Sequence, residues 1–151
     1  MYASPSNDWR DVPPKVLIVD NDRYTRRVIE TLISRDAEIS ALSPLVFTSD
    51  EPSEALQIFD RERPDVVIVD LLAPPSVGVE LCRTLRGKST RDLPILAMSA
   101  LYKDQKLIEE LRRELSVGFF AKPLQVRDLV RAVREHLQSV DEEHEPSVKT
   151  F

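Results

Sequence analysis

The sequence has few of the residues that build disulfides, cysteine-rich metal sites or histidine-based catalytic centres. Cys82 is the single cysteine, so an internal disulfide is excluded. It falls among leucines at helical spacing, which is typical of a small core residue and not of a nucleophile. Of the two histidines, His144 lies in a polar tail and His136 lies on the polar side of a predicted helix. A Ser-His-Asp catalytic triad therefore has little support.

Long apolar runs and targeting signals are also missing. No run approaches the roughly 20 apolar residues that a membrane-spanning helix needs, and Met1 to Pro14 lacks the basic-then-apolar pattern of a secretory signal. We therefore expect a cytoplasmic protein with no membrane insertion. The formal net charge of −5 disfavours nucleic acid as a direct partner. With 3 glycines and an apolar fraction of 42% in 151 residues, the sequence favours one compact, helix-rich domain.

Short apolar runs alternate with segments whose apolar residues recur at helical spacing. The predicted strands are 15–19, 45–48, 66–70, 94–98 and 118–121. The alternation predicts an α/β fold with a five-stranded parallel sheet and helices on both faces. We place the domain at residues 14–139, after a flexible arm over 1–13 and before a disordered acidic tail over 140–151. The connection from Asp36 to Pro44 has room for one weak extra helical turn.

Polar residues stand at the ends of four predicted strands. They are Asp20 and Asn21, Asp70, Ser99, and Lys122. The carboxyl ends of parallel strands meet at one edge of a sheet, where α/β folds bind their ligands. Carboxylate and amide oxygens suit Mg²⁺, an ionised Asp can attack phosphorus, and a lysine with a hydroxyl can neutralise phosphoryl oxygens. Each of these residues alone has an ordinary explanation, as a helix cap, a solvated lysine or a serine at a strand end. The occurrence of all of them at the ends of four predicted strands favours a phosphoryl-transfer site.

With these motifs, the chain resembles the receiver domain of two-component response regulators, the CheY-like domains, from about Lys15 to Gln138. The matching segments are Val-Leu-Ile-Val-Asp-Asn-Asp, Pro-Asp-Val-Val-Ile-Val-Asp, Leu-Pro-Ile-Leu-Ala-Met-Ser-Ala and Gly-Phe-Phe-Ala-Lys-Pro. The set is highly specific, although each segment alone would be weak. The resemblance implies a flavodoxin-like (βα)5 receiver fold.

The resemblance also implies a role for each site residue. Asp70 would be the phosphoacceptor, and Ser99 and Lys122 would contact its phosphoryl group. Phe119 would be the aromatic switch that follows Ser99. The implied Mg²⁺ ligands are Asp20, Asn21, Asp70 and the backbone carbonyl of Leu72. The bond between Lys122 and Pro123 is expected to be cis, as the family implies.

The partners implied by the resemblance are proteins. A sensor histidine kinase or a histidine phosphotransfer protein would donate the phosphoryl group, docking near the helix that follows Asp20. The face that responds would consist of the helix around 107–115, the strand of Phe119 and the last helix. It would bind a downstream protein target that the sequence does not identify, and the last helices could also form a homodimer. We expect a stand-alone receiver that acts as a binding module and not as an enzyme.

One departure from the family pattern leaves alternatives open. Asn21 occupies a position where receivers carry a second acidic residue, so we expect weaker Mg²⁺ binding. Asp22 could compensate in part, but its place favours capping of the next helix. A degenerate receiver, used as a scaffold without phosphorylation, is one alternative. The other is a phosphatase resembling the haloacid dehalogenases that uses Asp20, although Asp70 would then have no role.

Overall fold

The computed structural model describes residues 12–71, 75–89, 93–100, 104–122 and 125–144. Five parallel strands form one sheet in the order β2-β1-β3-β4-β5. The strands are β1 (Lys15–Val19), β2 (Leu45–Ser49), β3 (Val66–Asp70), β4 (Ile95–Ser99) and β5 (Val117–Ala121). The chain order reverses at β1, so β1 and β3 are neighbours and a crevice opens above their carboxyl ends. The predicted five-stranded parallel sheet of the flavodoxin-like type is confirmed.

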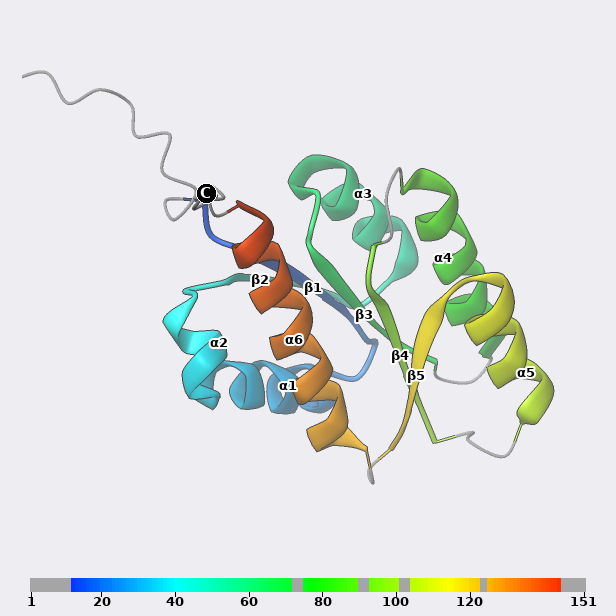
Figure 1. The fold of residues 1–151 in the computed structure, drawn as a ribbon. Helices are drawn as coiled ribbons and strands as arrows, with labels where there is room; N and C mark the ends of the chain where they lie inside the picture. The colour runs from blue at the N-terminus through cyan, green and yellow to red at the C-terminus, as the bar shows by residue number, and fades with distance from the viewer. Residues whose placement is uncertain (1–11, 72–74, 90–92, 101–103, 123–124, 145–151) are drawn as a thin grey trace, which may run out of the picture.

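Helices cover both faces of the sheet (Figure 1). One layer contains α1 (Arg23–Arg35), α2 (Ala37–Ala41) and α6 (Val126–His144). The other contains α3 (Pro52–Glu62), α4 (Pro75–Lys88), α5 (Gln105–Glu109) and the π-helical segment η2 (Glu110–Glu114), which continues from α5. Within the described ranges, no helix combines the length and the apolar character needed to cross a bilayer.

The central strand β3 shows why the apolar runs become strands. Successive side chains of a strand point to opposite faces of the sheet, so a strand covered on both faces must be apolar at every position. Val67 and Val69 pack into the core under α3 and α4, whereas Val66 and Ile68 pack into the core under α1 and α6. All four are at most 1% exposed. The burial of β3 on both sides places Asp70 firmly at the edge of the sheet.

Three strands differ from their predicted ranges by one residue at one or both ends, and the larger differences concern two helices. Helix α6 continues to His144, so the prediction of a disordered tail from residue 140 is wrong for its first residues. The segment from Val140 to His144 contains neither glycine nor proline, and nothing in it ends a helix before Pro146. The helix predicted around 107–115 is divided into α5 and η2. The sequence did not indicate this division, because apolar spacing does not distinguish an α-helical turn from a π-helical one. The predicted arm 1–13 lies outside the described residues, apart from its last two.

Helix α4 begins in close contact with the end of β3. A Cβ atom built at Gly78 would lie 2.5 Å from Cδ2 of Leu71 and 3.3 Å from the backbone oxygen of Asp70. Leu71 is itself buried, so little space is available into which its side chain could move. The first turn of α4 therefore packs directly on the backbone beside Asp70, because position 78 has no side chain.

We expect Gly78→Ala to lower the free energy of unfolding by about 1 to 3 kcal/mol, because the added methyl group overpacks a filled site. Gly87→Ala is a matched control in the same helix, since nothing lies within 4 Å of a Cβ at that position. The control should raise stability by about 0.5 kcal/mol through helix propensity. Urea denaturation of both variants tests the difference, and equal stability would contradict the close packing of α4 on β3.

Candidate functional site

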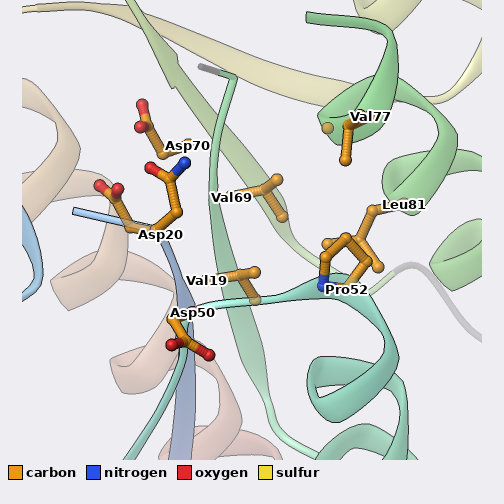
Figure 2. Close-up of a pocket in the computed structure, with 10 residues that line it drawn as sticks. Val19, Asp20, Asp50, Pro52, Val69, Asp70, Val77 and Leu81 are labelled. Atoms are coloured by element: carbon orange, nitrogen blue, oxygen red, sulfur yellow. The ribbon is translucent and has the colours of Figure 1, made fainter. Parts of the chain in front are cut away.

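Four strands bring the predicted polar residues to one edge of the sheet. Asp20 follows β1, Asp70 ends β3, Ser99 ends β4 and Lys122 follows β5. The register holds them at one level, since Asp70 pairs with Met98 and Ser99 pairs with Ala121, the residue before Lys122. Figure 2 shows the carboxylates of Asp20 and Asp70 side by side. The structure thus confirms that these four residues converge, as the sequence predicted.

Two buried carboxylates share one ammonium group in this site. The Nζ atom of Lys122 lies 2.6 Å from Oδ1 of Asp70 and 3.7 Å from Oδ2 of Asp20. The side chains of Asp20 and Asp70 are 0% and 2% exposed. When both carboxylates are ionised, the cluster carries one uncompensated negative charge in a place that water reaches poorly. Such an imbalance favours binding of a cation.

Several oxygen atoms of the cluster also lack hydrogen-bond donors. Among the described residues, Oδ2 of Asp20 and both carboxylate oxygens of Asp70 are buried and accept no hydrogen bond. Lys122 neutralises Asp70 by its charge at 2.6 Å, although its geometry is not that of a hydrogen bond. Buried oxygens without donors are rare and destabilising. Their presence here fits a site completed by an oxygen-seeking cation such as Mg²⁺.

The pKa of Asp20 records the same imbalance. Burial raises the pKa of this carboxyl to about 6, against a backbone hydrogen bond from Asp22 that lowers it. The N–H of Asp22 donates to Oδ1 of Asp20 at 2.8 Å. The charge of Asp70 raises the pKa of Asp20 further, and the ammonium of Lys122 partly opposes that rise. Near neutral pH, Asp20 is thus a carboxylate that gains from a positive ligand.

The residues after Asp20 divide between the site and the helix. Asn21 lines the cavity beside Asp20 and Asp70. Asp22 instead caps α1, because its carboxylate accepts hydrogen bonds from the N–H of Tyr24 at 3.2 Å and from Oγ1 of Thr25 at 2.6 Å. In the part of the chain that the structure describes, no three His, Cys, Asp or Glu side chains group as metal ligands. The metal site that the sequence predicts has two carboxylates, one amide and the backbone carbonyl of Leu72.

Ser99 is buried at the end of β4, next to the strand that ends in Asp70, and Phe119 is buried in β5. The hydroxyl of Ser99, 1% exposed, donates to the backbone oxygen of Leu71 at 3.3 Å. The N–H of Lys122 donates to the backbone oxygen of Ser99 at 3.0 Å, which ties the two strand ends together. Phe119 is buried in the core shared with α4 and η2. Leu72 and the bond between Lys122 and Pro123 lie outside the described residues, so their predicted roles stay predictions.

The structure adds two features that the sequence patterns did not indicate. A cavity of about 160 Å³ lies between the carboxylates and the starts of α3 and α4, and its apolar wall includes Pro52, Val77 and Leu81 (Figure 2). The guanidinium of Arg26, from α1, donates to the backbone oxygen of Asp20 at 2.6 Å. A basic residue in the first turn of a helix is too common in sequences to have identified this contact.

Fold and site together define a doubly wound α/β domain with an acidic site at its topological switch point. The chain matches the family model described as "Response regulator receiver domain" over residues 16–134. The chain belongs to this family of receiver domains. The phosphatase interpretation based on Asp20 is accordingly set aside.

Known proteins similar to this chain agree with that assignment. The chain is 33% identical over 128 residues to the "Probable transcriptional regulator ycf27" of Porphyridium aerugineum, covering 84% of this chain and 49% of the relative. It is 34% identical over 125 residues to the protein of the same description in Guillardia theta, covering 82% and 45%. The chain thus spans about half the length of these curated relatives.

Solved structures show the same similarity. The Francisella response regulator 1452 receiver domain has a TM-score of 0.68 and 25% identity, with 83% of this chain and 98% of that chain covered. A response regulator from Thermotoga maritima has a TM-score of 0.68 and 24% identity, with 84% and 99% covered. The second comparison supports the fold.

We expect Asp20→Asn to stabilise the protein at pH 7.5, in buffer without divalent metal, by about 1 to 3 kcal/mol. The pKa of Asp20 rises from 3.8 to about 6 on folding, so the folded state holds this proton more tightly. Its contribution to stability is complete below about pH 3.8 and is lost as the pH rises through 6. The gain from Asp20→Asn should therefore shrink when urea denaturation is repeated at pH 5.

Asp22→Asn is the matched control for this pH dependence. Hydrogen bonding from Thr25 lowers the pKa of the exposed Asp22, so its ionised form favours folding and its replacement should reduce stability at pH 7.5. An Asp20→Asn variant no more stable than the wild type at pH 7.5 would show that the buried carboxylate is compensated within the protein.

Proposed function

We propose that this chain accepts a phosphoryl group on Asp70 and thereby changes the face with which it binds another protein. The observation that carries the proposal is the state of the Asp70 carboxylate. It is buried at the crevice with Lys122 at 2.6 Å, and neither oxygen accepts a hydrogen bond among the described residues. A structural ion pair would be expected to satisfy those oxygens. An acceptor carboxylate needs one of them to be available.

The reaction is a transfer between two nucleophiles. A carboxylate oxygen of Asp70 attacks the phosphorus of a phosphohistidine in the donor protein. The new O–P bond forms as the P–N bond breaks, and the electron pair of that bond stays on the donor's imidazole. Lys122 offsets negative charge on the phosphoryl oxygens, and the hydroxyl of Ser99 can turn from Leu71 to donate to one of them.

The chemical types of the residues at the site are those that bind Mg²⁺, namely carboxylate and amide oxygens. Asp20 and Asp70 would hold it with their buried oxygens, and Asn21 would add an amide oxygen. When bound, the ion would neutralise charge on the phosphoryl group during transfer. With an amide in place of a third carboxylate, the site attracts the cation less strongly, and the ordering of Asp20 and Asp70 before binding becomes more important.

The face expected to respond to phosphorylation includes β5, which is the neighbour of the strand that ends in Ser99. Ala97 in β4 pairs with Phe119 in β5, so a shift of Ser99 toward the phosphate reaches Phe119 through neighbouring strands. Phe119 has no hydroxyl, and its switching would depend on packing alone. The face formed by α5 with η2, β5 and α6 is thereby altered for a protein target or for a homodimer. A histidine kinase or a phosphotransfer protein would dock near α1.

The relatives suggest what the switch controls. The part of those probable transcriptional regulators that matches this chain is 49% and 45% of their length, so each has a further part of similar size. We infer a transcriptional output in which DNA contacts come from a part or a partner other than this acidic domain. The chain itself would act as a regulated binding module and not as an enzyme.

Phosphorylation of Asp70 can be tested with acetyl phosphate and Mg²⁺. We expect intact-mass spectrometry to show addition of one phosphoryl group, which borohydride reduction and peptide mapping place on Asp70. Asp70→Asn should abolish it, whereas Asp50→Asn, a control at the rim of the same cavity, should retain it. No modification of the wild type under these conditions would favour the degenerate scaffold.

The charge of the metal site can be tested with Asn21→Asp. A third carboxylate should strengthen Mg²⁺ binding by about five- to thirtyfold, since residue 21 is exposed, and an added charge in water contributes about 1 kcal/mol toward a unit charge and roughly 2 kcal/mol toward a divalent ion. Calorimetric titration gives the dissociation constants. Asp22→Asn is the control and should leave the affinity unchanged, because that carboxylate is committed to capping α1. A weaker site in the control would show that Asp22 compensates for Asn21.

A further inference from the structure

The segment η2 joins the responding face to the core in an unusual conformation. It is π-helical over Glu110–Glu114, and π-helical turns are rare and often lie at functional sites. Leu111 anchors it in the core with no exposure. The chain leaves the segment through Ser116, whose φ of 53° is in the left-handed region, at a cost of about 1 kcal/mol for a residue with a side chain. This strained connection needs support from elsewhere in the fold.

Two arginines of α4 contact the two ends of η2. Arg83 forms an ion pair with Glu110, the first residue of the segment. Arg86 donates from Nε to the backbone oxygen of Leu115 at 2.8 Å and from Nη2 to that of Ser116 at 3.3 Å. Because the two arginines are three residues apart, they project from one side of α4.

The contact of Arg86 supplies what the end of a helix lacks. The last carbonyl groups of a helical segment have no partners within the helix and carry partial negative charge. The planar guanidinium of Arg86 offers two donors and a positive charge to the carbonyls that follow η2. It does so from 29 residues away in the sequence, so η2 is capped by another helix.

The other end of α4 contacts the phosphoacceptor strand. Gly78 brings the first turn of α4 against Leu71 and the backbone of Asp70. The backbone oxygen of Leu71 is also the acceptor of the Ser99 hydroxyl. One rigid helix of 14 residues, about 21 Å long, therefore contacts the candidate phosphorylation site at its start and η2 near its end.

Building on the proposed function, we propose that Arg83 and Arg86 form a clamp that holds η2 in its π-helical register. Through this clamp, α4 transmits a change at Asp70 to the face of η2 and β5. A displacement of Leu71 on phosphorylation moves the first turn of α4, and the clamp carries that movement to both ends of η2. The route runs beside the sheet, separate from the contact between Ser99 and Phe119. Arg83 and Arg86 are thus positioning residues.

Hydrogen exchange of the full chain, followed by mass spectrometry, tests the clamp in the resting state. In Arg86→Gln we expect the amides of 110–116 to exchange at least fivefold faster than in the wild type, because the segment loses its cap. Arg86→Lys keeps the positive charge but loses the paired guanidinium donors, so its exchange rate should lie between those of Arg86→Gln and the wild type. Lys88→Gln is the control, since Lys88 pairs with Asp60 of α3 at 3.0 Å and forms no hydrogen bond or ion pair with η2 among the described residues. Equal exchange in Arg86→Gln and Lys88→Gln would overturn the clamp.

The same measurement after treatment with acetyl phosphate and Mg²⁺ tests transmission. Phosphorylation should change exchange over 110–119 in the wild type and in Lys88→Gln, and Arg86→Gln should show less than half of that change at equal phosphoryl content. An undiminished change would overturn transmission through α4. If mass spectrometry finds no phosphoryl group on the wild type, the proposed function fails, and transmission fails with it. The clamp itself is still judged by the resting-state exchange.

A charge exchange tests the other end of the clamp. Arg83→Glu and Glu110→Arg should each raise exchange over 110–116 at least threefold, and the double variant should return to within twofold of the wild type, because the pair is restored with opposite polarity. A double variant whose exchange equals the combined effect of the two single changes would show that Arg83 and Glu110 do not act as a pair.

Discussion

The main electrostatic constraint in this structure is the burial of two carboxylates with only one lysine ammonium at the carboxyl edge of the sheet. Asp20 and Asp70 repel each other, and Lys122 neutralises only one of them at close range. The pKa of Asp20, raised to about 6 by burial, shows that the folded protein keeps this charge at a cost. Packing of the sheet must offset the loss of folding stability that this repulsion causes. A bound cation, or a change in the charge on Asp70, would reduce the repulsion.

The strand order explains how the arrangement is maintained. Because β1 and β3 are neighbours at the reversal of chain order, Asp20 and Asp70 are adjacent although they are far apart in the sequence. The apolar residues of β3 are buried on both faces, which prevents the strand ends from moving apart to relieve repulsion. The Ser99 hydroxyl and the first turn of α4 both contact Leu71, the residue that follows Asp70, so they are the neighbours closest to any change at that carboxylate.

Asn21 and Asp22 show how neighbouring residues divide two tasks. Asp22 uses its carboxylate to cap α1, so it contributes to helix stability and holds Asp20 through its N–H. Asn21 stays at the cavity with an amide. The cluster is therefore one charge less negative than a site with a full acidic pair. Such a site gains less from a metal, but it also repels an incoming phosphoryl group less strongly.

The elements of the fold and the polar residues at their ends can be predicted from the pattern of apolar residues. Short β-branched runs such as that of β3, alternating with helical segments, indicate buried strands, and the polar residues directly after such runs, Asp70 and Lys122 among them, lie at the edge of the sheet. The π-helical register of η2 and the contacts of Arg86 cannot be read from the sequence. The Arg86 contacts depend on how α4 packs against η2, and local spacing carries no record of that packing. The close approach of Gly78 to Leu71 likewise depends on the packing of α4 on β3, which local spacing does not record.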